Sequence, residues 1–216
     1  MWAGRLGRVK ALFTAVRQDD QAAVLALLDK SPDLINAIAK SPPKKDDGQS
    51  PLQVAIKAGH FAMANLLIDR GADINFVDAS KANSWNMPVV HDALRAATFS
   101  TRFGRNRALP GEPPEIEVMS TLERFEAAFG VLDRIVAMGA DVNATDSHGN
   151  PALARAVLDA RQVIDDPLLP ELADDLGRIF DLLKRAGADL AYVDQRVGET
   201  LIASFADEPV SAFLRG

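Results

Sequence analysis

The residue types that could carry chemistry are few and lie far apart along the chain. The sequence contains 3 His and no Cys, which excludes thiolate nucleophiles, disulfides and cysteine-based zinc sites. His60, His91 and His148 lack the spacing of a zinc-binding pair. Adjacent aspartates recur, but neighbours on a helix do not share a face. No phosphate-binding loop, dinucleotide fingerprint or nucleophile elbow is present. We therefore expect no enzymatic activity, no metal site and no cofactor.

One basic segment stands out from an acidic background. Arg95, Arg102, Arg105 and Arg107 follow one another with no Asp or Glu between them, and phenylalanines are interleaved. One interpretation is a site for an anion, an acidic partner or RNA. The other is a loop whose arginines pair with carboxylates of the same unit, such as Glu112, Glu115 and Glu117. The net charge of −6 argues against a general nucleic-acid binder.

An internal repeat predicts the elements that position these residues. The phrase GAD followed by a short polar turn occurs at 71–78, 139–146 and 187–194, and 31–36 is a degenerate copy. Apolar residues at helical spacing precede each phrase, namely Val24, Leu27 and Leu28, then Met63, Leu66 and Leu67, then Val131 and Ile135, then Ile179, Leu182 and Leu183. Positions i, i+3 and i+4 share one helix face. The glycine suits the left-handed residue that ends a helix.

A second phrase opens each unit with a large apolar residue followed three positions later by a small one. The pairs are Leu12/Ala15, Leu52/Ala55, Val90/Ala93 and Leu153/Ala156, with Ile202/Phe205 as a terminal variant. Such a pair lets a second helix approach closely. Ser50 and Thr200 are expected N-caps, and Pro51 suits the first helical position. Asn86 and Asn150 are the expected caps of the other two units.

Together these phrases resemble a known family. The stretch 47–78, DGQSPLQVAIKAGHFAMANLLIDRGADINFVD, looks like one whole ankyrin repeat, with SPLQVA in the place of the family's TPLHxA. The resemblance implies an all-α, ankyrin-repeat solenoid of about five helix-turn-helix units with β-like finger turns. We place the units at about 8–38, 47–78, 86–146, 148–194 and 197–216, the last one truncated, within a single domain, 1–216.

The units stand further apart than the family period of about 33 residues. Since the helix phrases are intact, we assign the excess to loops, as insertions at about 37–46, 79–86, 98–120 and 161–170. Pro110, Pro113 and Pro114 oppose regular helix in the longest insertion. We therefore expect the segment 102–115 to be mobile or irregular.

In this family the fingers and the first helices form a concave, protein-binding face. Trp85 and Tyr192 lie in fingers and suit interface anchors. We expect the lengthened finger to project with Trp85 at its tip. The alternative, in which the indole folds back onto Met87, Val89 or a neighbouring finger, stays open. His91 occupies the position where the family histidine braces adjacent units. The candidate partner-binding residues are Trp85, Tyr192, His91, Arg95, Arg102, Arg105, Arg107 and His148.

The resulting hypothesis is a non-catalytic scaffold that binds another protein through its concave face and fingers. A narrower version is an inhibitor or immunity protein that blocks a toxin. The alternative is a nucleic-acid- or anion-binding regulator that uses the loop 95–107. No apolar run approaches the roughly 20 residues of a membrane span, and the amino terminus lacks the pattern of a signal peptide. We expect a cytoplasmic monomer without a membrane partner, although a second copy covering the face stays possible.

Overall fold

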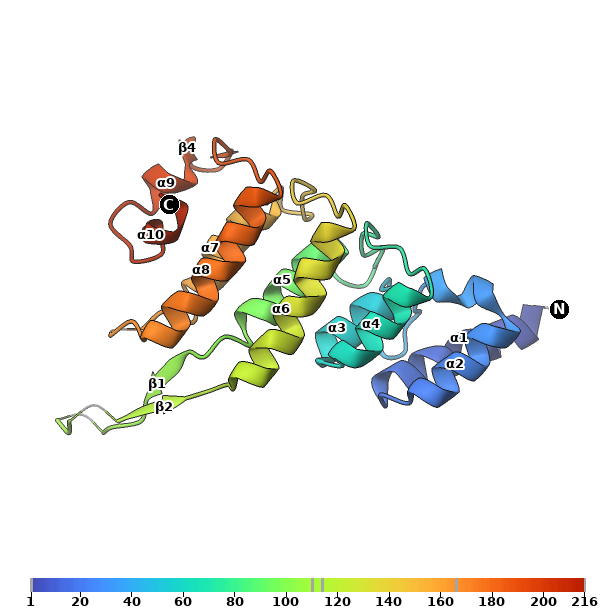
Figure 1. The fold of residues 1–216 in the computed structure, drawn as a ribbon. Helices are drawn as coiled ribbons and strands as arrows, with labels where there is room; N and C mark the ends of the chain where they lie inside the picture. Colours follow the sequence, from blue (N-terminus) through green and yellow to red (C-terminus); the bar gives the residue numbers. More distant parts are fainter. Residues whose placement is uncertain (1, 110, 114, 166, 216) are drawn as a thin grey trace.

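The computed structural model describes residues 2–109, 111–113, 115–165 and 167–215, and its described helices stack side by side in sequence order (Figure 1). The helices are α1 (Trp2–Arg17), α2 (Gln21–Lys30), α3 (Pro51–Ala58), α4 (Phe61–Asp69), α5 (Val89–Thr98), α6 (Leu122–Ala137), α7 (Ala152–Ala160), α8 (Pro170–Arg185), α9 (Leu201–Ser204) and α10 (Ser211–Leu214). The mostly helical architecture fits an ankyrin solenoid, as the sequence predicted. The number of units stays a prediction. None of the helices in the described ranges is long and apolar enough to cross a membrane.

The stack has two layers around one hydrophobic core. The first helices α1, α3, α5 and α7 contact one another in turn, and α6 contacts both α4 and α8. Leu12, Leu52 and Leu153, the large members of three opening pairs, are buried. Of the apolar residues predicted to share one face of α4, Met63 and Leu67 are buried, whereas Leu66 is only partly buried and packs against the core.

The GAD phrases end helices and join neighbouring fingers. Gly71, Gly139 and Gly187 have φ of 86°, 92° and 83°, the left-handed region in which a side chain is strained. The aspartate two residues after each glycine accepts a hydrogen bond from the amide two residues further on. A finger asparagine then accepts from the amide of the next unit's aspartate, in the pairs Asn36–Asp73, Asn75–Asp141 and Asn143–Asp189, at 2.8, 3.0 and 2.9 Å. The recurring phrase therefore supplies a hydrogen-bonded ladder along the fingers.

The helix starts agree only partly with the expected caps. Ser50 forms a capping box with Gln53 at α3, and Thr200 caps α9, as predicted. Asn86 and Asn150 are not caps, because α5 and α7 begin after prolines at 88 and 151. Two short 3-10 helices, η1 (Pro32–Asn36) and η2 (Lys44–Asp46), lie in the segment between α2 and α3.

The excess length does not lie only in loops. Helices α6 and α8 each have 16 residues, whereas α2 has 10 and α4 has 9. Our assignment of the excess to loops is therefore only partly right for the third and fourth units, where insertions separate α5 from α6 and α7 from α8 but the second helix is also longer. The added turns pack against each other, since Arg178 of α8 pairs with Glu126 of α6 at 2.6 Å and its guanidinium lies over the rings of Phe125 and Phe129.

The longest insertion contains a β-hairpin. Strand β1 (Gly104–Asn106) pairs antiparallel with β2 (Ile116–Val118), and the hairpin projects from the stack beyond the ends of α5 and α6 (Figure 1). Of the segment 102–115, for which we expected mobile or irregular structure, the expectation is wrong for residues 104–106, which form β1. Residues 107–109, 111–113 and 115 belong to no helix or strand. Gly104 permits the close approach, because an added Cβ would lie 2.6 Å from Ile116 and 2.8 Å from Leu169. Pro110 and Pro114 lie outside the described residues. A second pair, β3 (Val193–Asp194) and β4 (Glu199–Thr200), forms the last finger.

Candidate protein-binding site

Two first helices and two fingers bring six side chains together. Helix α5 carries Arg95, helix α7 carries Arg155 and Asp159, the finger before α5 carries Trp85, and the finger before α7 carries Asp146 and His148. We call this group the Trp85 cluster. It lies on the face of the first helices and the fingers, where the resemblance places partner binding.

Trp85 is half-buried and held from several sides. Its indole Nε1–H donates to Asp146 Oδ2 at 3.0 Å. The guanidinium carbons of Arg95 and Arg155 lie 5.0 and 5.2 Å from the ring centroid, within cation–π range. The imidazole of His148 lies 6.0 Å from it. The expectation of a tip that projects without scaffold contacts is therefore wrong. The open alternative holds instead, because the indole contacts the neighbouring finger.

Asp159 links the two arginines beneath the indole. Its Oδ1 accepts from Arg95 at 2.7 Å and from Arg155 at 3.0 Å, and its side chain is 0% exposed. Burial raises the pKa of Asp159, although both guanidiniums oppose the rise. Burial likewise lowers the pKa of Arg155, against the attraction of Asp159. Arg155 Nε and Asp159 Oδ2 are buried without a hydrogen-bond partner. Two cations thus share one buried carboxylate oxygen.

Asp146 ties the indole to the finger backbone. Its Oδ1 accepts from the amides of His148 and Asn150 at 2.9 and 3.0 Å. Burial by itself raises the pKa of Asp146, but the bonds from Asn150, Trp85 and His148 outweigh it, and the net pKa is lowered. The carboxylate therefore stays ionised at neutral pH, and its bond to the indole is charge-assisted.

His91 braces the scaffold and is not available to a partner. The ring is 0% exposed, and Nε2 lies 3.0 Å from the carbonyl oxygen of Ala144 in the next unit. A carbonyl can only accept, so Nε2 carries the proton. The structure corrects the inclusion of His91 among the partner-binding residues, because no atom of a partner can reach it.

The arginines of the basic segment are dispersed over three places. Arg95 belongs to the Trp85 cluster. Arg102 pairs with buried Asp175 of α8 at 2.6 Å, which ties the base of the hairpin to the fourth unit. Arg107 pairs with Glu117 across the hairpin at 2.6 Å, and Arg105 lies over the ring of Phe103 at 5.6 Å. Of the two interpretations left open by the sequence, the one in which these arginines pair with carboxylates of the chain holds for Arg95, Arg102 and Arg107. A single basic patch for an anion or an acidic partner is not formed.

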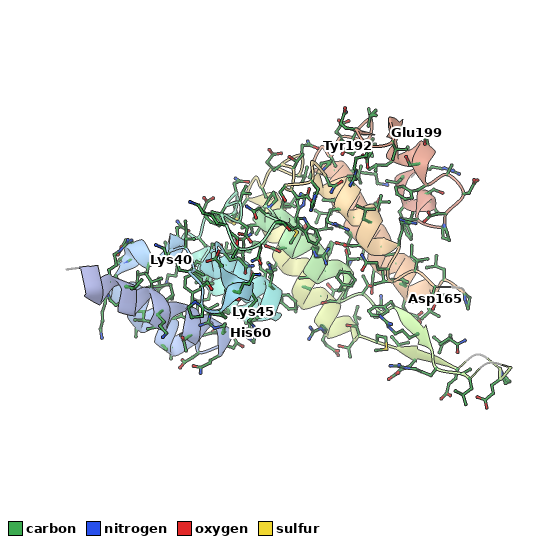
Figure 2. All side chains as sticks on the ribbon, turned by 180° about the vertical axis from the view of Figure 1, so that it is seen from behind. Lys40, Lys45, His60, Asp165, Tyr192 and Glu199 are labelled. Carbon is green, nitrogen blue, oxygen red and sulfur yellow. The ribbon has the colours of Figure 1, made fainter. Side chains whose placement is uncertain are left out.

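Tyr192 lies in the finger that follows α8, in the carboxy-terminal part of the stack (Figure 2). Its hydroxyl donates to the carbonyl oxygen of Gly149 at 3.1 Å, and the side chain is half-buried. Gly149 follows His148 directly, so the two predicted aromatic anchors flank the same finger. The structure brings Trp85, Arg95 and His148 together, places Tyr192 beside them, and sets Arg102, Arg105 and Arg107 apart.

A groove of 810 Å³ adjoins the cluster at Arg155. Leu158, Ile164 and Leu168 supply apolar lining, while Arg161 and Glu208 pair with each other on its wall at 2.5 Å. Arg155, Asp159 and Asp146 were not among our candidates. The spacing of Arg155 and Asp159, i and i+4 on one helix face, was the available signal, but their meeting with Trp85 depends on the stacking of units.

Among the described residues, no group of three or more His, Cys, Asp or Glu side chains gathers as metal ligands would. The amino-terminal part of the chain, residues 6–78, matches a family model described as ankyrin repeats (3 copies). No match was found among curated proteins.

Proposed function

Because the chain is an ankyrin-repeat protein, we propose that it binds a partner protein at the face that carries the Trp85 cluster. Ankyrin repeats in general mediate protein–protein interaction. The observation that carries the proposal is an indole that is half-buried yet fixed in place, bonded to Asp146 at 3.0 Å and covered by two guanidiniums.

A fixed aromatic side chain suits an interface anchor for a physical reason. Binding normally orders mobile side chains, at about 0.5–1.5 kcal/mol for each flexible one. Trp85 has already lost that freedom in the folded chain, since its hydrogen bond and stacking contacts are intramolecular. Tryptophan, tyrosine and arginine are also the residue types enriched among the energetically dominant contacts of interfaces. Arg95, Tyr192 and exposed His148 provide neighbouring contacts on the same face.

The groove beside Arg155 gives a partner side chain room next to the anchor. Its apolar lining by Leu158, Ile164 and Leu168 favours an aliphatic or aromatic group. The paired charges of Arg161 and Glu208 on the wall favour polar contacts at the rim. An apolar centre with a polar rim is the usual anatomy of a protein interface.

The test begins with capture of the partner from the source cells on immobilised chain, followed by affinity measurement on the purified pair. Trp85→Ala should weaken binding by about 2 kcal/mol or more, roughly thirtyfold in Kd. His148→Ala is the companion variant, because that ring is exposed and its loss leaves the bond between Trp85 and Asp146 intact. Val118→Ser on the hairpin, a 50% exposed site away from the cluster, is the control that should leave Kd unchanged.

Trp85→Ala also removes a charge-assisted bond, so its folding must be measured beside its binding. We expect a stability loss of about 1–3 kcal/mol, which leaves the variant folded at 10 °C if the parent is an ordinary domain. Unchanged affinity for both Trp85→Ala and His148→Ala, with folding intact, would place the interface elsewhere.

The narrower role of an inhibitor or immunity protein is part of this proposal and rests on the resemblance alone. If the captured partner is an enzyme or a toxin, titration with the chain should abolish its activity at a one-to-one ratio, and Trp85→Ala should shift the titration. The nucleic-acid alternative is not carried forward, since Arg95, Arg102 and Arg107 each pair with a carboxylate of the chain.

A further inference from the structure

A second groove, of 560 Å³, lies at the opposite end of the stack. One wall is a single face of α1, and the other is the segment 36–43, which begins at the last residue of η1. The lining side chains of α1 are Arg5, Leu6, Val9, Lys10, Phe13 and Arg17. Their spacing of three and four residues keeps them on one helix face, so the wall runs for about 18 Å along the helix axis. Figure 2 shows Lys40 of the other wall at the amino-terminal part of the stack.

The floor of this groove is apolar and partly open to solvent. Leu6 of α1 is 63% exposed and Ile38 of the opposite wall is 42% exposed, whereas Phe13, a further lining residue of α1, is buried. Leu6 and Ile38 thus give one groove two exposed, large apolar side chains, and exposed apolar surface that is contiguous is typical of interaction sites. Covering them with an apolar side chain of a partner would remove this surface from water and so stabilise the complex.

The charged side chains along this groove are all basic, in a chain of net charge −6. Arg5 and Arg17 are compensated outside the groove, by Asp33 at 3.0 Å and Asp46 at 2.5 Å. Lys10 and Lys40 have no carboxylate of a described residue within ion-pair distance. The side chains of Lys10 and Lys40 therefore belong to opposite walls of the groove, and among the described residues that line it none is acidic.

We propose that this groove binds a short acidic, amphipathic segment of a partner protein. An aliphatic side chain of the segment covers Leu6 and Ile38, and carboxylates on either side of it meet Lys10 and Lys40. The charges of the groove select an acidic segment over a basic one, and the apolar floor selects against a purely polar one. This second contact surface extends the proposed function, and it is separate from the Trp85 cluster, which lies on α5, α7 and the fingers before them.

A peptide is a better occupant than a nucleic acid. Single-stranded nucleic acids bind through aromatic stacking platforms together with closely spaced cations. Phe13, the aromatic residue among the described lining residues, is only 3% exposed and cannot stack on a base. Two uncompensated lysines would also release few counterions, so they would give weak phosphate binding at physiological salt.

The experiment uses fluorescence polarisation of a fluorescein-labelled nine-residue probe, Glu-Asp-Leu-Glu-Glu-Leu-Leu-Glu-Asp, titrated with the full chain. A second probe has glutamine in place of each leucine, and a third has lysine in place of each acidic residue. We expect saturable binding of the first probe and binding at least about tenfold weaker for the other two. Raising the salt from about 50 to about 300 mM should weaken the first complex, because the ion pairs are exposed.

The variants assign the binding to this groove. Lys10→Glu with Lys40→Glu should weaken binding of the first probe about tenfold or more, and Ile38→Gln should do so without a change of charge. Lys30→Glu is the matched control, since Lys30 is exposed on α2 of the same unit but does not line the groove. Far-UV circular dichroism and the thermal midpoint of each variant confirm that it is folded. Trp85→Ala should bind the probe like the parent chain, which separates this proposal from the proposed function.

Several results would overturn the inference. One is the absence of saturable binding, and another is equal loss with Lys30→Glu, which would reduce the effect to general charge attraction. A third is a concentration-dependent dimer, seen by light scattering and abolished by the double lysine variant, because a second copy would then occupy the groove. Preference for the lysine-substituted probe would also contradict it.

Discussion

The neighbouring residues His91 and Asp92 should each make the free energy of unfolding depend on pH. The two dependences have opposite directions and should largely cancel. Both side chains are buried. Burial lowers the pKa of His91 from 6.5 to about 4. Nε2 donates to Ala144, so an added proton would occupy Nδ1, which is buried without a partner. Burial raises the pKa of Asp92 from 3.8 to about 7, although Lys57 and the amide of Gln53 oppose the rise.

The titrations of His91 and Asp92 change the free energy of unfolding with pH in opposite directions. The unfolded chain protonates His91 at higher pH than the folded chain does, so the stability that neutral His91 contributes is lost as the pH falls from about 6.5 to about 4, by about 3 kcal/mol. The unfolded chain ionises Asp92 at lower pH than the folded chain does. The contribution of protonated Asp92 to the free energy of unfolding is therefore fully present below about pH 4. About 4 kcal/mol of it is lost as the pH rises towards about 7. Between these limits the two slopes oppose each other.

Two substitutions should separate these effects. Gln53 occupies in the second unit the place that His91 has in the third, and its Nε2 donates to the carbonyl oxygen of Met87 at 2.9 Å. His91→Gln thus keeps a donor for Ala144 while removing the titration. Asp92→Asn keeps an oxygen that accepts from Gln53, which donates to it at 2.8 Å.

The assay is urea denaturation of the parent chain and both variants at several pH values, compared as differences in the free energy of unfolding. Between about pH 7.5 and about pH 4, the His91→Gln variant should gain about 3 kcal/mol relative to the parent. The Asp92→Asn variant should lose about 4 kcal/mol relative to the parent over the same range. If the difference in free energy of unfolding between each variant and the parent stays constant with pH, or if both differences change in the same direction, burial does not shift the two pKa values as argued. Taking differences removes the titration of the remaining carboxylates.

Three further outcomes are expected. Leu67→Ala and Leu183→Ala, both at residues that are 0% exposed, should each cost about 2–5 kcal/mol in urea denaturation, and a cost under about 0.5 kcal/mol would place either side chain outside the core. Arg102→Met leaves the carboxylate of Asp175 buried and unpaired, so it should cost about 3–5 kcal/mol, and Asp175→Leu added to it should restore part of that loss. Prolonged chelation with EDTA should leave the far-UV spectrum and the Tm unchanged, and a clear loss of helix would show a structural metal.

Much of the fold could be predicted from the sequence because its signals are local. A glycine after an apolar stripe ends a helix through backbone geometry alone, as the positive φ of Gly71, Gly139 and Gly187 shows. Ser50 and Gln53 form their capping box within one helical turn. These features need only residues a few positions apart, so the repeat phrases were enough to predict helices and fingers. The sequence did not predict which of the two adjacent leucines, Leu66 or Leu67, is fully buried, because that depends on how the neighbouring helices pack against α4.

The candidate site depended on the tertiary structure. Trp85 meets Asp146 across 61 residues, and Arg102 meets Asp175 across 73. The lengths of α6, α8 and the hairpin set those distances, and no local pattern fixes them. Residue type alone could not tell whether an arginine stays available to a partner or pairs within the chain. Such pairing depends on a buried carboxylate, and the carboxylate is buried next to the arginine only when the units are stacked. The sequence by itself therefore determined the repeated scaffold, and packing between the units decided which side chains are left to bind.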